Sequence, residues 1–329
     1  MLEKLFSITD VGIIRTVRIL GMKFEFLNSI EFAKNVFRTI RSTTVLDYLP
    51  KLYIPVAEHC NDNCYGCWTF STLAKEEFYD IKTFEQDINR LSELTSLTSE
   101  GGGGATPYTG EVTLAGGEPL LNPNIISFFE LSRRAFPDPS VKIVLITNGL
   151  LLLKQKAPFF KAVLDNNITI SPTKYPDMDW NKIEQYVESF GVTLQYSTDM
   201  GFQSGPVSNK NERVSGKMPL HLDGKCSLTP FDSYSRCGLS NGACSVMRNG
   251  KLYPCSIIAG IRHFNSHFNQ NLPVSSHDYM DIYKVANCKE ILEYMAKPHP
   301  FCKYCNVAGR VASFGEYRKT THSISEWTT

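Results

Sequence analysis

The stretch Glu111-Val-Thr-Leu-Ala-Gly-Gly-Glu-Pro119 is a short apolar strand that runs directly into two glycines and a carboxylate. Similar runs bounded by turn residues recur at Lys51–Ala57, Lys142–Thr147, Ile168–Ser171 and Thr193–Tyr196, with a weaker one at Met218–Leu222. Helical patterns alternate with them at Phe84–Leu97, Ile125–Phe136, Pro158–Asp165 and Lys182–Phe190. This alternation predicts βαβ units and a parallel sheet. Five or six units are too few for a closed eight-stranded barrel, so we expect an open, partial α/β barrel.

The composition excludes several classes of protein. Hydrophobic residues make up 42% of the 329-residue chain, which is enough for a packed core. A formal net charge of +1 argues against nucleic acid as a partner of the whole chain. We expect no signal peptide and no transmembrane segment, because no apolar stretch approaches membrane-spanning length. In the cytoplasmic protein that this predicts, ten cysteines indicate metal binding or catalysis before disulfides.

Three regions differ in character. Residues 1–49 form a preamble with a predicted strand or hairpin over 12–23 and a helix over 30–40. Its first 45 residues carry seven basic and four acidic side chains, which suits a solvated packing appendage or weak peripheral membrane contact. Residues 50–223 are the predicted barrel, interrupted by a linker at 101–104 that lacks the Lys of a phosphate loop. Residues 224–329, which contain seven cysteines and a predicted helix over Lys289–Lys297, form a smaller second domain.

The first cysteine cluster follows the first predicted strand. Cys60, Cys64 and Cys67 have the spacing C-x3-C-x2-C. Three thiolates on one tight loop suit three irons of a cubane cluster and leave the fourth iron open. A structural zinc ion needs a fourth ligand, which His59 could supply, but its direct neighbour Cys60 makes a shared tetrahedral geometry awkward. The spacing therefore favours iron–sulfur over zinc.

The glycines of the opening stretch add a second feature at the same edge of the sheet. Gly116 and Gly117 allow close approach of a ligand to the backbone, and the Glu118 carboxylate suits an ammonium group. Both this turn and the cysteine loop follow carboxyl ends of parallel strands, where such folds place their chemistry. Together they are a specific signal for a ligand site beside the cysteines.

These features resemble the radical S-adenosylmethionine (SAM) superfamily over residues 50–325. The likeness rests on the cysteine spacing, on Gly116-Gly-Glu-Pro119 and on Ile146-Thr-Asn-Gly149. It implies a partial (β/α)6 barrel in which Cys60, Cys64 and Cys67 hold a [4Fe–4S] cluster that chelates SAM. The family pattern further implies that Gly116, Gly117 and Glu118 position the SAM amino group. Ser171 matches a ribose contact.

One position departs from this pattern, and other stretches narrow the resemblance. Gly66 stands where the superfamily often has an aromatic contact to adenine, so Tyr65 or Trp68 is expected to replace it. Residues 59–74, 117–123 and Ser325-Glu-Trp327 resemble a group that accompanies bacterial surface-polysaccharide genes, as does the stretch over 18–23. That resemblance implies a sugar or glycan precursor as substrate.

A second set of cysteines lies in the C-terminal region: Cys226, Cys237, Cys244, Cys255, Cys288, Cys302 and Cys305. A predicted hairpin around Asn249-Gly250 places Arg248 opposite Lys251, so that Cys244 faces Cys255. The C-x2-C pair Cys302 and Cys305 adds a strong metal signal.

This arrangement resembles the Twitch domain, a short form of the SPASM extension, which binds one auxiliary [4Fe–4S] cluster. Cys255, Cys302 and Cys305 are the implied ligands. Family spacing favours Cys237 as the fourth and the hairpin favours Cys244, with a structural zinc site as the alternative. Cys288 is expected in the core. Cys226 is a spare ligand, an inert thiol or a hydrogen-atom donor.

The resemblance implies an oxidoreductase or epimerase that receives electrons from flavodoxin or ferredoxin. A 5′-deoxyadenosyl radical would abstract hydrogen from a small polar substrate, and polar residues near strand ends are candidate contacts: Lys174, Tyr175, Asp177, Asp199 and His221. One alternative is a maturase of ribosomal peptides, although residues 1–49 do not suggest the usual winged-helix recognition domain. The other is a non-catalytic, zinc-binding adaptor.

Overall fold

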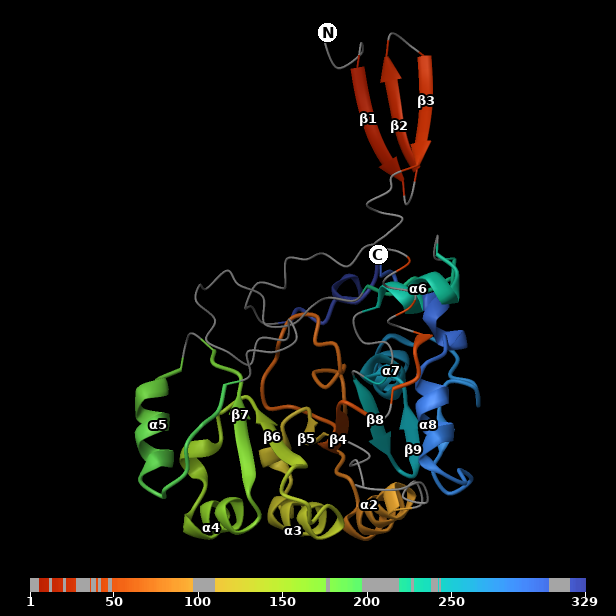
Figure 1. Cartoon of the computed structure of the whole chain (residues 1–329). Coiled ribbons are helices and arrows are strands. Elements are labelled where there is room, and N and C mark those ends of the chain that lie inside the picture. Colours follow the sequence, from red (N-terminus) through yellow and green to blue (C-terminus); the bar gives the residue numbers. More distant parts are fainter. Residues whose placement is uncertain are drawn as a thin grey trace. The chain divides into compact units, whose positions relative to one another are not determined.

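The computed structural model describes residues 6–11, 14–19, 22–27, 36, 40, 43–46, 49–96, 110–175, 178–196, 219–225, 228–237, 242, 244–307 and 320–329. The chain divides into two compact units, Met1–Thr44 and Val45–Thr329. In the first unit, β1 (Phe6–Val11), β2 (Ile14–Ile19) and β3 (Met22–Leu27) form an antiparallel sheet in that order (Figure 1). The β2–β3 pair confirms the predicted hairpin. Of the predicted helix over 30–40, positions 36 and 40 are helical and the rest lies outside the described residues.

A seven-stranded sheet forms the centre of the second unit, with the order β10-β9-β8-β4-β5-β6-β7. Four parallel strands come from the predicted barrel: β4 (Leu52–Ala57), β5 (Glu111–Gly116), β6 (Lys142–Thr147) and β7 (Ile168–Pro172). The other three come from the C-terminal region: β8 (Ser245–Arg248), β9 (Lys251–Tyr253) and β10 (Met280–Asp281). Strand β8 pairs in parallel with β4, so both regions share one sheet. The predicted boundary between a barrel domain and a smaller second domain at residue 224 therefore stays a prediction.

Helices follow each of the four parallel strands and cover one face of the sheet (Figure 1). They are α2 (Ile81–Ser96), α3 (Ile125–Ala135), α4 (Ala157–Asp165) and α5 (Trp180–Glu188), close to the predicted ranges. Their aromatic side chains form the main core with alternate strand residues, as Phe84 and Phe128 do with Ile54 and Leu114. This confirms the βαβ units expected from the alternating pattern.

The fifth and sixth predicted strands are wrong within the described residues. Residues 193–196 form no strand, and the Gln195 N–H makes a single 2.9 Å hydrogen bond to the carbonyl of Ile170 in β7. At 218–222 only Leu220 forms isolated bridges, to Cys305 and Thr328. One hydrogen bond does not sustain a ladder, and the edge of β4 that a barrel would close is occupied by β8. The described chain thus has four βα units rather than six.

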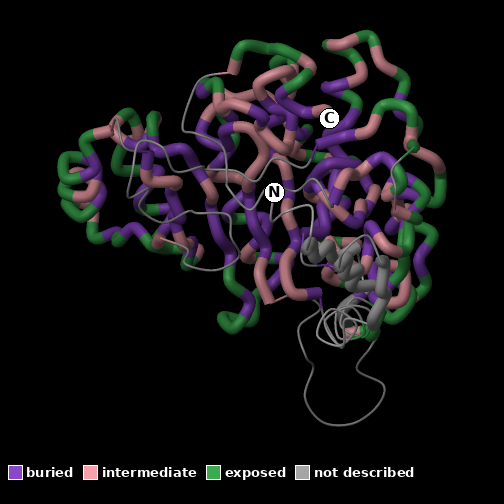
Figure 2. The backbone as a smooth tube through the Cα atoms, turned by 90° about the horizontal axis from the view of Figure 1, so that it is seen from above, coloured by how far each residue is buried: buried purple, intermediate pink, exposed green. Residues whose placement is uncertain are grey.

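The C-terminal region contains α6 (Pro230–Arg236), α7 (Ser256–Phe268) and α8 (Cys288–Met295). Helix α8 was expected, but α7 was not, because its buried residues leave no clear polar stripe. A second core, which includes Phe70, Phe264, Phe301 and Trp327, packs around α7. Short 3-10 turns lie at Pro119–Leu121, Leu152–Lys154, Pro300–Tyr304 and Ile324–Glu326. Figure 2 shows the buried residues running through the interior of this unit.

None of the helices in the described ranges is long and apolar enough to cross a lipid bilayer.

Candidate active site

A cavity of about 690 Å³ lies on the face of the sheet that the α2–α5 helices leave open. Side chains alternate along a strand, so residues that point away from the helical core point into this cavity. They include Tyr53 and Pro55 from β4, Ala115 from β5, Ile146 from β6 and Ser171 from β7. The volume falls in the usual range of small-molecule sites.

The first cysteine loop forms one wall of this cavity. Cys60, Cys64 and Cys67 are free, partly exposed thiols, and all three line it. Burial raises the pKa of the Cys60 thiol to about 12 and also raises that of Cys64. A thiol in such a place loses its proton readily only to a metal ion or a strong electrostatic partner.

Each of the three sulfurs has its own side-chain hydrogen-bond partner. Asn148 Nδ2 donates to Cys60 Sγ at 3.6 Å. The hydroxyl of Tyr175 lies 3.3 Å from Cys64 Sγ, and that of Thr69 lies 3.2 Å from Cys67 Sγ. These groups can donate to thiolates once the sulfurs bind a metal, which is a common way of tuning a metal centre. Neither Thr69 nor Asn148 was singled out from the sequence, although Asn148 belongs to the Thr-Asn-Gly motif.

Gly116 packs directly against the backbone at the end of β4, and Gly117 packs against the start of the cysteine loop. A Cβ atom added to Gly117 would lie 2.0 Å from the carbonyl oxygen of His59. The N–H of Gly117 donates to Ala57 O at 2.8 Å, and the N–H of Glu118 donates to His59 O at 3.0 Å. Only glycine allows this approach, so the Gly-Gly pair fixes the loop to the end of β5.

Glu118 lies below the cavity surface rather than on it. Its side chain is 0% exposed, and it is absent from the cavity lining. The carboxylate accepts hydrogen bonds from Thr147 Oγ1 at 2.7 Å, Asn148 N–H at 2.8 Å and Leu120 N–H at 3.0 Å. Burial raises the pKa of Glu118 to about 7, against the opposing effect of these donors. The residue therefore ties the ends of β5 and β6 together and places Asn148 beside Cys60.

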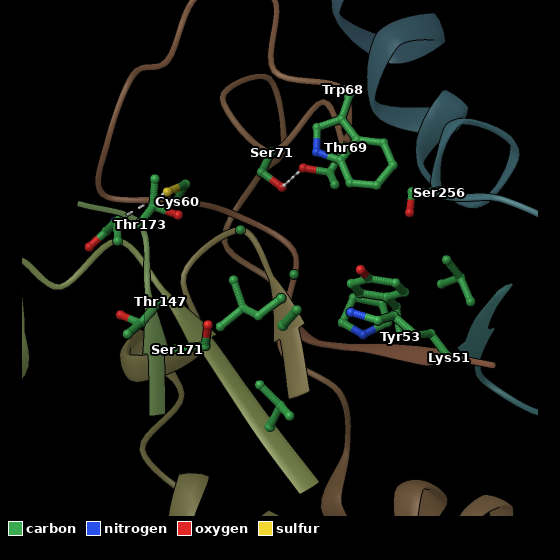
Figure 3. Close-up of a pocket in the computed structure, with 18 of the residues that line it drawn as sticks. Lys51, Tyr53, Cys60, Trp68, Thr69, Ser71, Thr147, Ser171, Thr173 and Ser256 are labelled. Atoms are coloured by element: carbon green, nitrogen blue, oxygen red, sulfur yellow. Dashed lines mark hydrogen bonds between the residues drawn. The ribbon is translucent and has the colours of Figure 1, made fainter. Parts of the chain in front are cut away.

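Trp68 and Ser171 line the cavity, whereas Tyr65 does not. Figure 3 shows Trp68, Tyr53 and Ser256 on the right of the view, with Cys60 and Ser171 on the left. Trp68 is thus the better placed of the two aromatic candidates. The structure also explains Gly66, since its φ of +59° is left-handed and an added Cβ would lie 3.2 Å from the Glu326 carbonyl oxygen. An aromatic side chain at position 66 would be strained.

The hairpin of the second cysteine set has the predicted register, with Arg248 opposite Lys251. Cys244 and Cys255 flank it, and Cys244 is fully buried with its sulfur 3.3 Å from Ser256 Oγ. Burial raises the pKa of Cys255 well above its usual value, with further increases from the nearby Cys237, Cys302 and Cys244. Burial likewise raises the pKa of Cys302 to about 12, and Cys237 adds to the shift.

Both Cys237 and Cys255 thus lie within electrostatic reach of Cys244 and Cys302, and of each other. Cys305 follows one turn after Cys302, its N–H donating to the Cys302 carbonyl at 3.2 Å. Both Cys237 and Cys244 lie near Cys255, so the choice between them stays open.

The second cysteine set adjoins the cavity. Ser256 lines the cavity and contacts Cys244, and Tyr53 also lines it with Cys244 near enough to influence its hydroxyl. Burial, followed by the proximity of Cys244 and Glu111, raises the pKa of Tyr53. A cluster on these cysteines would lie behind the cavity wall. Cys288 is buried in the main core as expected, and Cys226 lies outside the described residues.

The donor sets fit iron–sulfur clusters by their chemistry, because both are composed of cysteine sulfurs, which are soft ligands. Within the described residues, no three His, Cys, Asp or Glu side chains are arranged to hold a single metal ion. A [4Fe–4S] cluster attaches each thiolate to a different iron, so its ligands need not converge on one point.

The candidate substrate contacts separate into distinct groups. Tyr175 lines the cavity, but Lys174 forms a 2.8 Å ion pair with Glu184 and does not line it. His221 lies against Thr329, with Nδ1 3.2 Å from its hydroxyl. Asp177 and Asp199 lie outside the described residues.

An ion pair that the sequence did not reveal also borders the cavity. Arg248 Nε lies 2.7 Å from Glu58 Oε1, and His263 Nε2 lies 2.8 Å from Glu58 Oε2. No motif marks these residues, because the pair forms between β8 and the end of β4.

No family model matches the sequence, and no curated protein matches it. Among solved structures, the chain is similar to histidine-tagged anSMEcpe with bound AdoMet, at 19% identity over 44% of this chain and 42% of that one, with a TM-score of 0.33. It is similar to BtrN in complex with AdoMet and 2-DOIA at 14% identity, over 83% and 99% of the two chains, with a TM-score of 0.42. It is also similar to Streptococcus suis SuiB bound to precursor peptide SuiA, at 17% identity over 52% of this chain and 38% of that one, with a TM-score of 0.32. The matches to tagged anSMEcpe and SuiB span less than half of those chains.

Proposed function

We propose that this protein is a radical SAM enzyme that acts on a small polar molecule, with a sugar or glycan precursor as the favoured substrate. One observation carries the proposal: the thiols of Cys60, Cys64 and Cys67 open on the same cavity as Gly116-Gly117 and the ends of β6 and β7. A cluster, a nucleotide-like cofactor and a substrate all need access to one enclosed space. The open sheet would correspond to an incomplete (β/α)6 barrel.

In this proposal the three cysteines hold a [4Fe–4S] cluster, and SAM lies along the strand ends. Gly116 and Gly117 border its methionyl end, Ser171 contacts the ribose, and Trp68 packs against adenine. The Glu118 side chain is fully buried and does not line the cavity, so it would not reach the amino group directly. We therefore assign Glu118 to positioning, through Asn148 and the Gly-Gly backbone.

When bound, the reduced cluster and SAM would supply the radical chemistry that removes a hydrogen atom from an unactivated carbon. The chain's own contribution is to orient the two molecules and to exclude water from the cavity. Polar groups on the inner face of the sheet, such as Thr169 and Ser171, suit a hydroxyl-rich substrate. The Glu58–Arg248 pair adds charge at the same wall.

We further propose that Cys255, Cys302, Cys305 and either Cys237 or Cys244 hold an auxiliary [4Fe–4S] cluster. The position of Cys244 beside Ser256 and Tyr53 supports a two-electron oxidation of the substrate, because an electron acceptor must lie close to the site of hydrogen removal. Epimerisation is the competing outcome and would require a thiol donor, for which Cys226 remains the candidate. Flavodoxin or ferredoxin is the proposed external reductant.

Anaerobic purification and reconstitution tests this function. We expect a brown protein with about eight irons per chain that cleaves SAM to 5′-deoxyadenosine. Cys60→Ala should lose this cleavage, whereas Cys288→Ala, which removes a core thiol away from the cavity, should retain it. A colourless protein that holds stoichiometric zinc and leaves SAM intact would overturn the proposal. Turnover of a peptide but of no sugar nucleotide would replace the substrate class.

A further inference from the structure

Residues 320–329 contact the first cysteine loop although they follow it by about 260 positions in the sequence. We infer that this 320–329 segment holds the loop in the conformation that presents its thiols to the cavity, with Glu326 and Trp327 as the positioning residues. The contacts that fix the loop are present in the chain without a cluster, so they can be tested without one. Only the consequence for cluster retention rests on the proposed function.

The contacts go to the backbone of the loop itself. Glu326 Oε2 accepts the N–H of Gly66 at 3.0 Å, and Trp327 Nε1 donates to the carbonyl of Cys67 at 2.8 Å. The N–H of Thr320 donates to the carbonyl of Asn63 at 2.7 Å. These three bonds lie on either side of Cys64 and at Cys67 itself. The loop has neither a sheet nor a helix to satisfy these groups, so the 320–329 segment takes that role.

Glu326 is suited to hold an irregular loop in place. Its carboxylate is 1% exposed and also accepts bonds from the hydroxyls of Thr320 and Thr321, both at 2.7 Å, and from Thr321 N–H at 2.6 Å. Burial alone would raise the pKa of Glu326, but these donors together with Gly66 N–H lower it below its usual value. The group is therefore ionised at neutral pH, and a charged acceptor makes the stronger bond to Gly66.

The segment is itself fixed to the second core. The indole of Trp327 is 2% exposed and lies between Phe70 and Phe268, at centroid distances of 6.4 and 5.6 Å. Its carbonyl accepts the N–H of Leu220 at 2.7 Å, and Leu220 bridges to Cys305. Burial of the indole would by itself explain why the segment packs on this core. It does not explain why the Glu326 carboxylate and the indole N–H bind the consecutive loop residues Gly66 and Cys67. That pairing points to a positioning role.

The same contacts join the two cysteine sets through a short path. It runs from Cys67 through Trp327 and Leu220 to Cys305. Displacement of the 320–329 segment is therefore expected to disturb the first loop directly. The β4–β5 ladder, which has its own backbone hydrogen bonds, should remain.

Two variants test the inference. Glu326→Gln keeps the side-chain size but turns one acceptor oxygen into an N–H₂ group, and Trp327→Phe keeps an aromatic ring but removes the donor to Cys67. Glu293→Gln on the surface of α8 is the matched control. Hydrogen–deuterium exchange of the cluster-free full chain should show the Gly66 amide exchanging about tenfold faster in Glu326→Gln, as loss of a charged hydrogen bond predicts. Exchange in β5 reports whether each variant is folded.

A second readout follows the reconstituted chain. Iron should leave the first cluster faster in both variants than in the wild type or Glu293→Gln when a chelator is added. Wild-type exchange at residues 63–67 in both folded variants would overturn the inference. If Glu326→Gln unfolds, Trp327→Phe decides the matter, because it retains the aromatic packing. If the wild-type protein binds no iron, the proposed function is refuted. Faster exchange at residues 63–67 in the variants would still support the positioning role.

Discussion

Alanine at Gly117 provides a sharp test of how the site is assembled. The added Cβ would lie 2.0 Å from the His59 carbonyl oxygen and 2.3 Å from its carbon. Ordinary van der Waals contact begins near 3.4 Å, so the two backbones must separate by about 1.4 Å. Both contact atoms belong to the backbone, and no side-chain rotation relieves the clash.

That displacement breaks two buried hydrogen bonds, from Gly117 N–H to Ala57 O and from Glu118 N–H to His59 O. A buried polar group left unpaired costs about 1–3 kcal/mol, so we expect Gly117→Ala to lower the free energy of unfolding by ~2–4 kcal/mol. The cysteine loop moves with His59, and the cluster-free protein should therefore also take up less iron.

Urea denaturation of the cluster-free protein measures the first effect, and iron per chain after reconstitution measures the second. Gly191→Ala is the control. It places a Cβ in open space at a left-handed φ of +77°, at a cost of ~1 kcal/mol, far from the cysteines. If Gly117→Ala is no less stable than Gly191→Ala and binds iron like the wild type, the close packing of β5 on the loop is not what shapes the site.

Three further predictions concern other parts of the molecule. Tyr175→Phe removes the hydroxyl beside Cys64 and should lower the reduction potential of the first cluster by on the order of 40 mV, measured by EPR-monitored titration; an unchanged potential would contradict the hydrogen bond. The raised pKa of Glu118, about 7, favours the protonated form in the folded chain, so stability should fall by ~3 kcal/mol as the pH rises from 4.5 to 7. Urea titrations of Glu118→Gln should lack that component, and equal slopes in both proteins would refute the assignment. Cys305→Ala should retain SAM cleavage and the first cluster but lose product formation, and full turnover by this variant would rule out a required auxiliary cluster.

Local patterns were sufficient for much of this protein. The strand–helix alternation predicted five or six βα units, and the described residues form four of them, because period-2 and period-3.6 patterns depend only on neighbouring residues. The spacing of Cys60, Cys64 and Cys67 predicted that the three thiols lie on one loop, since only eight consecutive residues contain them. All three line the cavity. The Asn249-Gly250 turn predicted the register that brings Cys244 and Cys255 together for the same reason.

Long-range packing decided the rest. The sequence predicts that Glu118 lies beside the ligand, and only the fold shows that its carboxylate is buried against Thr147 and Asn148 at the end of β6. No local pattern shows that β8 pairs with β4 or that Glu326 meets Gly66, because these contacts join segments about 190 and 260 residues apart. Sequence alone therefore predicted the candidate site residues and determined which loop presents the thiols of Cys60, Cys64 and Cys67. Tertiary structure decided which groups face the cavity, and which distant segment satisfies the backbone of that loop, because burial and hydrogen bonding are completed only when the chain is folded.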